Sequence, residues 1–413
     1  MLEKTVEANF ISFSETGAHN GEMKPAEWTR VTAEAQWAPR GRIVAPVLCL
    51  CLLFLCSLTL AQSRKEQIQD ALRKTPHPDS AAEFQTVPHL SCLNQGKTSI
   101  CWSFATSSFV ESEMARLKLP TVRLSVAYPV YCAFLEKARR FVRMHGDSRV
   151  NAGDLFMGVF NTCRDYGAIP LSVYGGPTPD KPLDHSRLYA EVEKLMREVK
   201  AKGEWDENAV VGNMKTILNH HLGEPPQEFS YEGKKYTPRS FVADVVRLPW
   251  NEYRMITSFK YAPFNTFTEF KVPDNWQHDT NFFNVPLNEY YAAFKGALQA
   301  GYSVSVSIDV SEPSYQTTGK YCLMPESELA TEQLTQDARE AGYQSRKTTD
   351  DHAVHFIGWK DVGGEDWFLA KDSWKTIWQN KNEGNLLVHS SYVKMKVLAF
   401  IVHRDGVPGL QQK

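Results

Sequence analysis

The chain has 413 residues, a formal net charge of −2 at pH 7, 42% hydrophobic residues and 12% aromatic residues. This composition is ample for one large two-lobed core or for two to three domains, and it excludes a disordered chain. The near-neutral charge gives no indication of nucleic-acid binding.

The N-terminal part has the pattern of an export signal. Residues 1–42 show no clean periodicity and are expected to form an unstructured leader, whose true start we place at Met23. Residues 43–61 are almost entirely apolar and end in small residues, which is typical of a signal peptide and predicts an exported, periplasmic or extracellular protein. Because 19 residues can just span a bilayer, an uncleaved membrane anchor is the alternative. The polar stretch 62–84 is expected to be a lead-in segment.

The cysteines do not form a disulfide framework. Three of the eight lie in the apolar segment, and an odd number remains, which is compatible with one free reactive thiol. No two are spaced C-x-x-C, so we expect neither a metal nor another cofactor. The remaining five are Cys92, Cys101, Cys132, Cys163 and Cys322.

A polar loop turns into a helix at one of these cysteines. Thr98 and Ser99 are N-cap residue types, which predicts that Cys101 lies in the first turn of the helix. There the free N–H groups and the helix macrodipole favour a thiolate over a thiol. Gln95, six residues earlier, can bring its amide toward the thiolate and form a two-donor oxyanion hole with the Cys101 N–H.

Further helices follow before the strands. A helix around 131–143 carries four basic side chains that we expect on a solvated face, and another helix lies within 151–170. Residues 180–300 are expected to form a helical insertion, followed by a strand at 302–308 and a polar, helix-capable stretch at 313–349. The four basic residues are Lys137, Arg139, Arg140 and Arg143.

The C-terminal part is rich in strands. A hairpin is predicted from a strand that begins at His352, a Gly-Gly turn at 363–364, and a second strand that leads into Asp372. Strands are also predicted at 386–388 and 397–402. Helices first and strands last indicate an α+β fold with a helical lobe and a sheet lobe.

A nucleophilic cysteine needs a base and a group that orients the base. His352 and His355 lie on opposite faces of one predicted strand, so only one can face a cleft. The following hairpin strand leads into Asp372 and Trp374, and the alternation by itself leaves the choice between the two histidines open.

These segments resemble a known family. The string from Gln95 to Phe104 resembles the nucleophile motif of papain-like cysteine peptidases, and His352-Ala353 resembles their His-Ala. Residues 151–170 resemble a block of the bleomycin hydrolase and aminopeptidase C branch. The resemblance implies a papain-like, two-lobed α+β fold over residues 85–408. In that fold an active-site cleft lies between a helical lobe and an antiparallel sheet or barrel lobe. Only a short tail, 409–413, follows.

The resemblance also assigns roles. It implies a catalytic triad of Cys101, His352 and Asp372, and an oxyanion hole of Gln95 and Cys101. Backbone contact with a peptide or protein substrate falls to Gly153, and Trp374 lines the cleft and shields the His–Asp bond. Asp372 stands where the family has Asn, and its charge should stabilise imidazolium and raise the pKa of His352.

Alternatives remain open at this point. The resemblance allows a peptidase, a transferase that uses the same acyl-enzyme, or an inactive scaffold that binds peptides or glycans. Asp372 and Lys375 depart from the family pattern and favour the scaffold, whereas Gln95, Cys101 and His352 oppose it. Bleomycin hydrolases place a long C-terminal arm in their cleft, and the few residues after Pro408 are too short for this. Our hypothesis is therefore an open cleft that permits endopeptidase as well as aminopeptidase action, with the oligomeric state left open.

Overall fold

The computed structural model divides the chain into two units, residues 1–56 and 57–413. All described residues belong to the second unit, so the predicted leader, the 43–61 segment and Lys375 lie outside them. None of the helices within this described part is long and apolar enough to cross a membrane. The described ranges are 65–175, 183–318, 320–325, 333–374 and 384–410.

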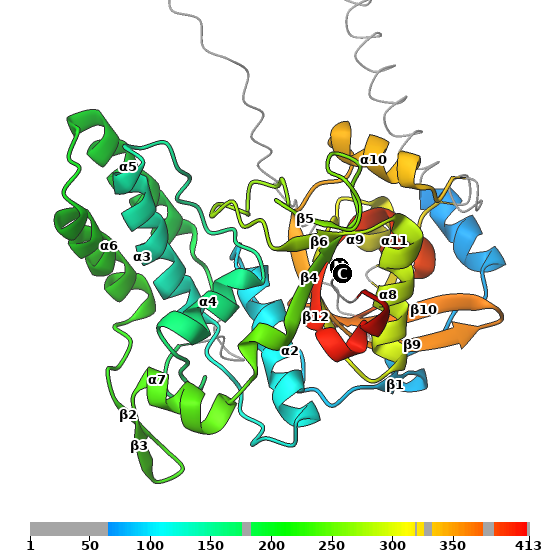
Figure 1. The fold of residues 1–413 in the computed structure, drawn as a ribbon, viewed down its shortest axis with the longest axis horizontal. Coiled ribbons are helices and arrows are strands. Elements are labelled where there is room, and N and C mark those ends of the chain that lie inside the picture. Colours follow the sequence, from blue (N-terminus) through cyan, green and yellow to red (C-terminus); the bar gives the residue numbers. More distant parts are fainter. Residues whose placement is uncertain (1–64, 176–182, 319, 326–332, 375–383, 411–413) are drawn as a thin grey trace, which may run out of the picture. The chain divides into compact units, whose positions relative to one another are not determined.

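One group of helices gathers on one side of the second unit (Figure 1). Its apolar side chains face inward at helical spacing, as Leu188, Val192, Met196 and Val199 do. The group comprises α3 (Ala127–Arg143), α4 (Met157–Asp165), α5 (Ser186–Lys202), α6 (Glu207–Leu222) and α7 (Pro238–Phe241).

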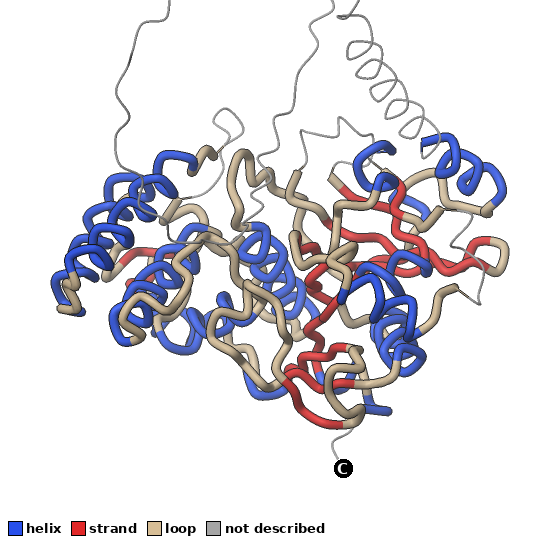
Figure 2. Tube along the Cα trace, turned by 90° about the horizontal axis from the view of Figure 1, so that it is seen from above, coloured by secondary structure: helices blue, strands red, loops and turns tan. Residues whose placement is uncertain are grey.

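The other side is built on a mostly antiparallel sheet (Figures 1 and 2). The strands follow the order β5-β6-β4-β12-β7-β9-β10-β11-β8, and β1 pairs with β9 off this path. Among the strands in the described part of the chain, β4–β6 and β8–β11 pair in parallel and the other pairs are antiparallel. The strands are β1 (Gln85–Thr86), β4 (Tyr253–Thr257), β5 (Thr266–Thr268), β6 (Phe282–Asn284), β7 (Val304–Ile308), β8 (Tyr321–Cys322), β9 (His352–Val362), β10 (Glu365–Lys371), β11 (Asn385–His389) and β12 (Val397–His403).

Helix α2 (Cys101–Arg116) lies between these two groups. It packs against α3 and α4 on one side and against β7 and β9 on the other. Every residue from Trp102 to Met114 is buried, including serines and threonine. Small side chains allow this close packing on two sides, and one of their hydroxyls, Ser103 Oγ, donates to Val126 O over 2.7 Å.

The expected insertion, 180–300, is helical at both ends but contains strands in its middle. After α7 and a short π-helix (Val242–Val246), the chain enters the main sheet as β4, β5 and β6. These strands are three to five residues long, and β5 has no buried residue, so their apolar pattern is too short to stand out in the sequence.

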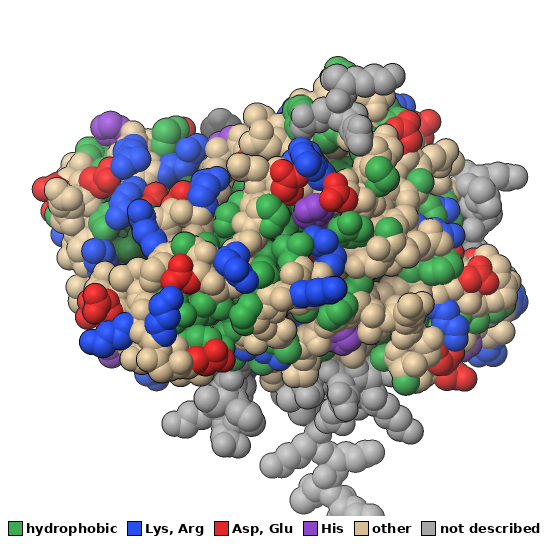
Figure 3. All heavy atoms as spheres, turned by 60° about the horizontal axis from the view of Figure 1, so that its bottom comes forward, with side chains coloured by type: hydrophobic (Ala, Val, Ile, Leu, Met, Phe, Trp, Pro, Cys, Tyr) green, Lys and Arg blue, Asp and Glu red, His purple; other side chains and the backbone are tan. Residues whose placement is uncertain are grey.

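The remaining elements lie close to their predicted positions. Helix α8 (Leu287–Gln299) precedes β7, and the hairpin β9–β10 turns at Gly363-Gly364. The polar stretch 313–349 contains α9 (Pro313–Thr318) and α10 (Gln336–Gln344). On the face in Figure 3, basic and acidic side chains are interspersed among polar and apolar ones.

Candidate active site

Cys101 is the first residue of α2, which places its side chain where the helix N–H groups point outward. The residue before the helix is Ile100, and no side chain caps the helix. The expected capping by Thr98 or Ser99 is therefore wrong, and Thr98 Oγ1 donates instead to Gln95 O over 2.9 Å. Cys101 is partly exposed, whereas the four other cysteines in the described part of the chain are buried and, like it, unbridged.

His352 lies beside both other members of the predicted triad. Its Nε2 is 2.9 Å from Asp372 Oδ1, and the ring lines the same small cavity as Cys101. Burial of the ring works against protonation, but the neighbouring Cys101 and the hydrogen bond to Asp372 outweigh it and raise the pKa of His352 to about 10. The imidazole is therefore protonated at neutral pH.

The second strand histidine is placed elsewhere. His355 Nδ1 lies 2.9 Å from Ser108 Oγ, two turns along α2 from Cys101. Burial and the nearby Lys371 hold the pKa of His355 well below its ordinary value, so it is neutral. The strand alternation that separated the two histidines in the sequence thus leaves His352 beside the thiol.

Asp372 has both carboxylate oxygens occupied. Oδ1 accepts from His352 Nε2 and from the Ser373 N–H at 2.7 Å, and Oδ2 accepts from the Tyr315 hydroxyl at 2.7 Å. The carboxylate is fully buried, and Trp374 lies over the imidazole with ring centroids 4.8 Å apart. Trp374 therefore shields the His–Asp bond from water.

Tyr315 is a site residue that sequence reasoning missed. It lies on α9, inside the stretch read only as polar and helix-capable, and it is 1% exposed. Its partner Asp372 is 57 residues away, and no local pattern indicates such a pairing. The presence of Asp in place of Asn was the one available signal, because a buried carboxylate requires additional donors.

Gln95 is held against the strand end that carries Asp372. Its N–H donates to Ser373 O over 2.7 Å, and its Oε1 accepts from Ser373 Oγ over 2.5 Å. Its Nε2 donates to Thr98 O over 2.7 Å, which uses one of the two amide protons. These contacts fix the amide in the loop just before Cys101.

Gly153 lies in the loop before α4, and the Lys137 side chain donates hydrogen bonds to carbonyl groups of that loop. Lys137 Nζ donates to Asn151 O over 3.1 Å and to Gly153 O, and it lies 3.8 Å from Asp154 Oδ2. The expectation that Lys137 belongs to a solvated face is wrong, since the residue is 1% exposed. Its position on α3 points it toward Asn151, Gly153 and Asp154 rather than toward water.

A carboxylate covers Gly153 from the other side. A Cβ added at this glycine would lie 2.3 Å from Asp274 Oδ1, so no larger residue fits without movement. Asp274 comes from the loop between β5 and β6 and was not singled out from the sequence. Among the described residues, no group of three or more His, Cys, Asp or Glu side chains has the arrangement of a metal site.

Comparison with solved structures identifies the fold. The crystal structure of PepW from Lactobacillus rhamnosis HN001 matches with a TM-score of 0.61 and 17% identity, covering 89% of this chain and 94% of that chain. A structure from work on the mite allergens Blo t 1 and Der p 1 matches with a TM-score of 0.38 and 13% identity, covering 80% and 70%. That second similarity is too low to support an argument.

Comparison of the sequence with known families and proteins does not identify a relative. No protein-family model matches the chain, and no curated protein matches it. The similarity to PepW extends over nearly the whole of both chains, and the mixed helix-and-sheet architecture agrees with it. The chain therefore has the papain-like fold that the motifs around Cys101 and His352 predicted.

Proposed function

We propose that the chain is a cysteine peptidase that hydrolyses peptide bonds through a thioacyl-enzyme. One observation carries the proposal: the buried His352 ring bonds to the Asp372 carboxylate and lines one small cavity with Cys101, which is close enough to raise the pKa of the ring. This is the arrangement of nucleophile, acid–base group and orienting group that acyl transfer requires.

The reaction follows from the protonation state of the imidazole. The Cys101 sulfur attacks the peptide carbonyl carbon, and the oxygen takes the negative charge toward the Gln95 amide and the Cys101 N–H. Protonated His352 gives its proton to the leaving amine as the C–N bond breaks. The neutral ring then takes a proton from water, whose oxygen displaces the thiolate and releases the acid.

The carboxylate at position 372 fits this cycle as well as an amide would. It accepts the same hydrogen bond from the imidazole, and Tyr315 and Ser373 supply the further donors that its charge needs. The added negative charge favours imidazolium, so His352 enters the reaction as the acid.

Thiol labelling and peptide hydrolysis test the proposal together. An epoxide thiol inhibitor or iodoacetamide at mildly acidic pH should label Cys101 faster than a free thiol. A deeply buried cysteine such as Cys163, whose pKa burial raises to about 12, should stay unlabelled. Hydrolysis of a peptide library should disappear in Cys101→Ala and persist in Cys163→Ser.

Two other outcomes would point elsewhere. Labelling of Cys101 no faster than a free thiol, with no hydrolysis, would indicate a papain-like binding scaffold. Hydrolysis that survives in Cys101→Ala would remove the thiol from the mechanism.

We also propose that the protein acts after export, in the periplasm or outside the cell. The support is the apolar segment 43–61 with small residues before Gln62. N-terminal sequencing of the protein recovered from an expressing cell should find Gln62. A chain that keeps the segment and sediments with membranes would favour the anchor instead.

A further inference from the structure

A large open groove lies beside the nucleophile and has a volume of about 1170 Å³. On the helical side it is lined by the end of α3 and the loop that follows, and on the sheet side by the end of α10 and the residues just before β9 (Figure 1). The β5–β6 loop supplies the rest of the lining, from Glu269 to His278. The groove is therefore bounded by segments from both sides of the molecule.

The groove reaches the active site. Asp350 lines both the groove and the small cavity that contains the Cys101 side chain. Arg149, which also lines the groove, lies near the carboxylate that covers Gly153: burial raises the pKa of Asp274 to about 6, and Arg149 is close enough to oppose this shift. A peptide that pairs with the Gly153 backbone on the acyl side of the scissile bond therefore has this groove beside its preceding residues.

The lining of the groove carries an excess of positive charge. Its carboxylates are Asp147, Glu269 and Asp350, and Glu269 is already paired with His278 over 2.7 Å. Four Lys or Arg side chains face them, and none of the four has an ion-pair partner among the residues that the structure describes. The whole chain has a net charge of −2, so this local excess is not a property of the composition. The four cations are Arg140, Arg149, Lys271 and Arg346.

Arg140 indicates which chemistry would complete the groove. The residue is half-buried, and its Nε is buried without a hydrogen-bond acceptor in the described part of the chain. A buried donor of this kind is unfavourable unless an acceptor from outside reaches it. A carboxylate meets the need well, because it can accept two parallel N–H bonds from one guanidinium. Arg149 and Arg346 are exposed on the same groove and can bind further carboxylates.

We propose that this groove binds acidic residues of the substrate, Asp or Glu, that lie upstream of the scissile bond. This rests on the proposed peptidase function and names its substrate class. The occupant is part of a peptide because the groove continues from the nucleophile. Its carboxylates gain charge-assisted hydrogen bonds to cations that have no other ionic partner. Binding upstream of the cleaved bond requires several preceding residues, so the preference acts in endopeptidase cleavage.

Alkylation of Cys101 by peptidyl chloromethyl ketones tests this on the full chain, because the ketone fixes the register and no turnover is needed. The acidic probe is acetyl-triglutamyl-alanyl-leucine chloromethyl ketone, and the neutral and basic probes carry triglutaminyl or trilysyl in place of triglutamyl. We expect the acidic probe to alkylate Cys101 about tenfold faster than the neutral probe at low ionic strength, which is the scale of one charge-assisted hydrogen bond. The basic probe should be slower than the neutral one. High salt should reduce the difference, because most of these cations face solvent.

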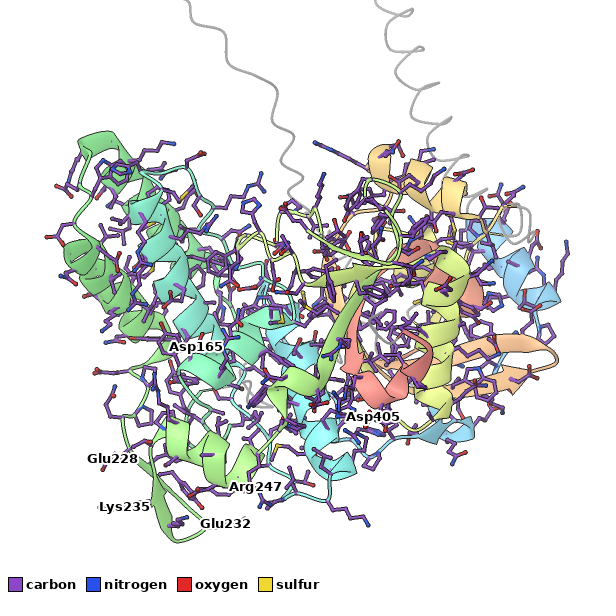
Figure 4. All side chains as sticks on the ribbon, viewed as in Figure 1. Asp165, Glu228, Glu232, Lys235, Arg247 and Asp405 are labelled. Carbon is purple, nitrogen blue, oxygen red and sulfur yellow. The ribbon has the colours of Figure 1, made fainter. Side chains whose placement is uncertain are left out.

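Charge-removing variants locate the effect. Arg149→Gln and Arg346→Gln should each lower the preference for the acidic probe severalfold, and the double variant should lower it further. Arg247→Gln is the matched control, since Arg247 is exposed just after the π-helix and outside the lining of the groove (Figure 4). This control should keep the full preference. The preference is a ratio of two rates on the same protein, so a smaller folded fraction does not change it.

The results separate this inference from the function on which it rests. Equal rates with the acidic and neutral probes would overturn the acidic-substrate inference and leave the peptidase proposal standing, and so would a preference that survives in the double variant. Equal rates together with protection of Cys101 by heparin would assign the groove to a sulfated polysaccharide instead. Failure of every probe, and of iodoacetamide, to modify Cys101 selectively would refute the peptidase proposal and this inference with it.

Discussion

Replacement of Asp372 by Asn removes one buried negative charge and little else. Asn has the same shape, its Oδ1 can accept from His352 Nε2 and the Ser373 N–H, and its Nδ2 can donate to the Tyr315 hydroxyl oxygen. The tyrosine changes from donor to acceptor, so the asparagine keeps all three contacts and the variant should fold.

The size of the effect follows from the contact distance. The pKa of His352 rises from its ordinary 6.5 to about 10, supported by Cys101 and by Asp372 at 2.9 Å. Loss of an opposite charge at this distance lowers a pKa by about one to three units, and each unit corresponds to about 1.4 kcal/mol of stabilisation of imidazolium. Cys101 remains, so the pKa should fall only part of the way.

The pH dependence of kcat/KM reports this change. Protonated His352 is the required acid, so activity is present below its pKa and is lost as the pH rises through it. In Asp372→Asn the alkaline limb should therefore move to lower pH by about one to three units. The acidic limb should move less.

Asp165→Asn is the matched control. Asp165 is exposed at the end of α4, on the helical side of the molecule, where it pairs with the neighbouring Arg164 (Figure 4). Its profile should coincide with that of the unmodified protein. If the alkaline limb of Asp372→Asn coincides as well, Asp372 does not hold the imidazolium, and the reasoning from contact and burial is refuted.

Three further substitutions test single contacts. Tyr315→Phe leaves Asp372 Oδ2 without its donor and should lower the free energy of unfolding, measured by urea denaturation, by about 1–3 kcal/mol. Peptide hydrolysis should show a fall in kcat/KM. Unchanged values in both measurements would mean that the hydroxyl is not needed. Gln95→Ala should reduce kcat about 10²–10³-fold with little change in KM, and an effect confined to KM would exclude Gln95 from the oxyanion hole. Lys137→Met leaves Asp154 buried without its cation and should lower the free energy of unfolding, measured by urea denaturation, by about 3–5 kcal/mol. A decrease below about 1 kcal/mol, which is the scale of an exposed ion pair, would show that the pair is not needed.

The sequence by itself determined the chemistry-bearing elements. The helix that begins at Cys101, the strand that begins at His352 and the hairpin that ends at Asp372 are all encoded by local patterns of turn residues and alternation. The family motifs assigned those three residues to one cleft. The PepW-like fold agrees with the architecture that this assignment implied.

The tertiary structure alone decided what surrounds those residues. Tyr315 reaches Asp372 across 57 residues, and Asp274 covers Gly153 from a loop more than a hundred residues away. Lys137 looked like one of several surface cations, yet it supports the Gly153 loop from inside. Periodicity indicates which side of an element is apolar, but a polar contact between distant segments leaves no periodic trace. It forms only when the packed layers bring a donor and an acceptor to the same place.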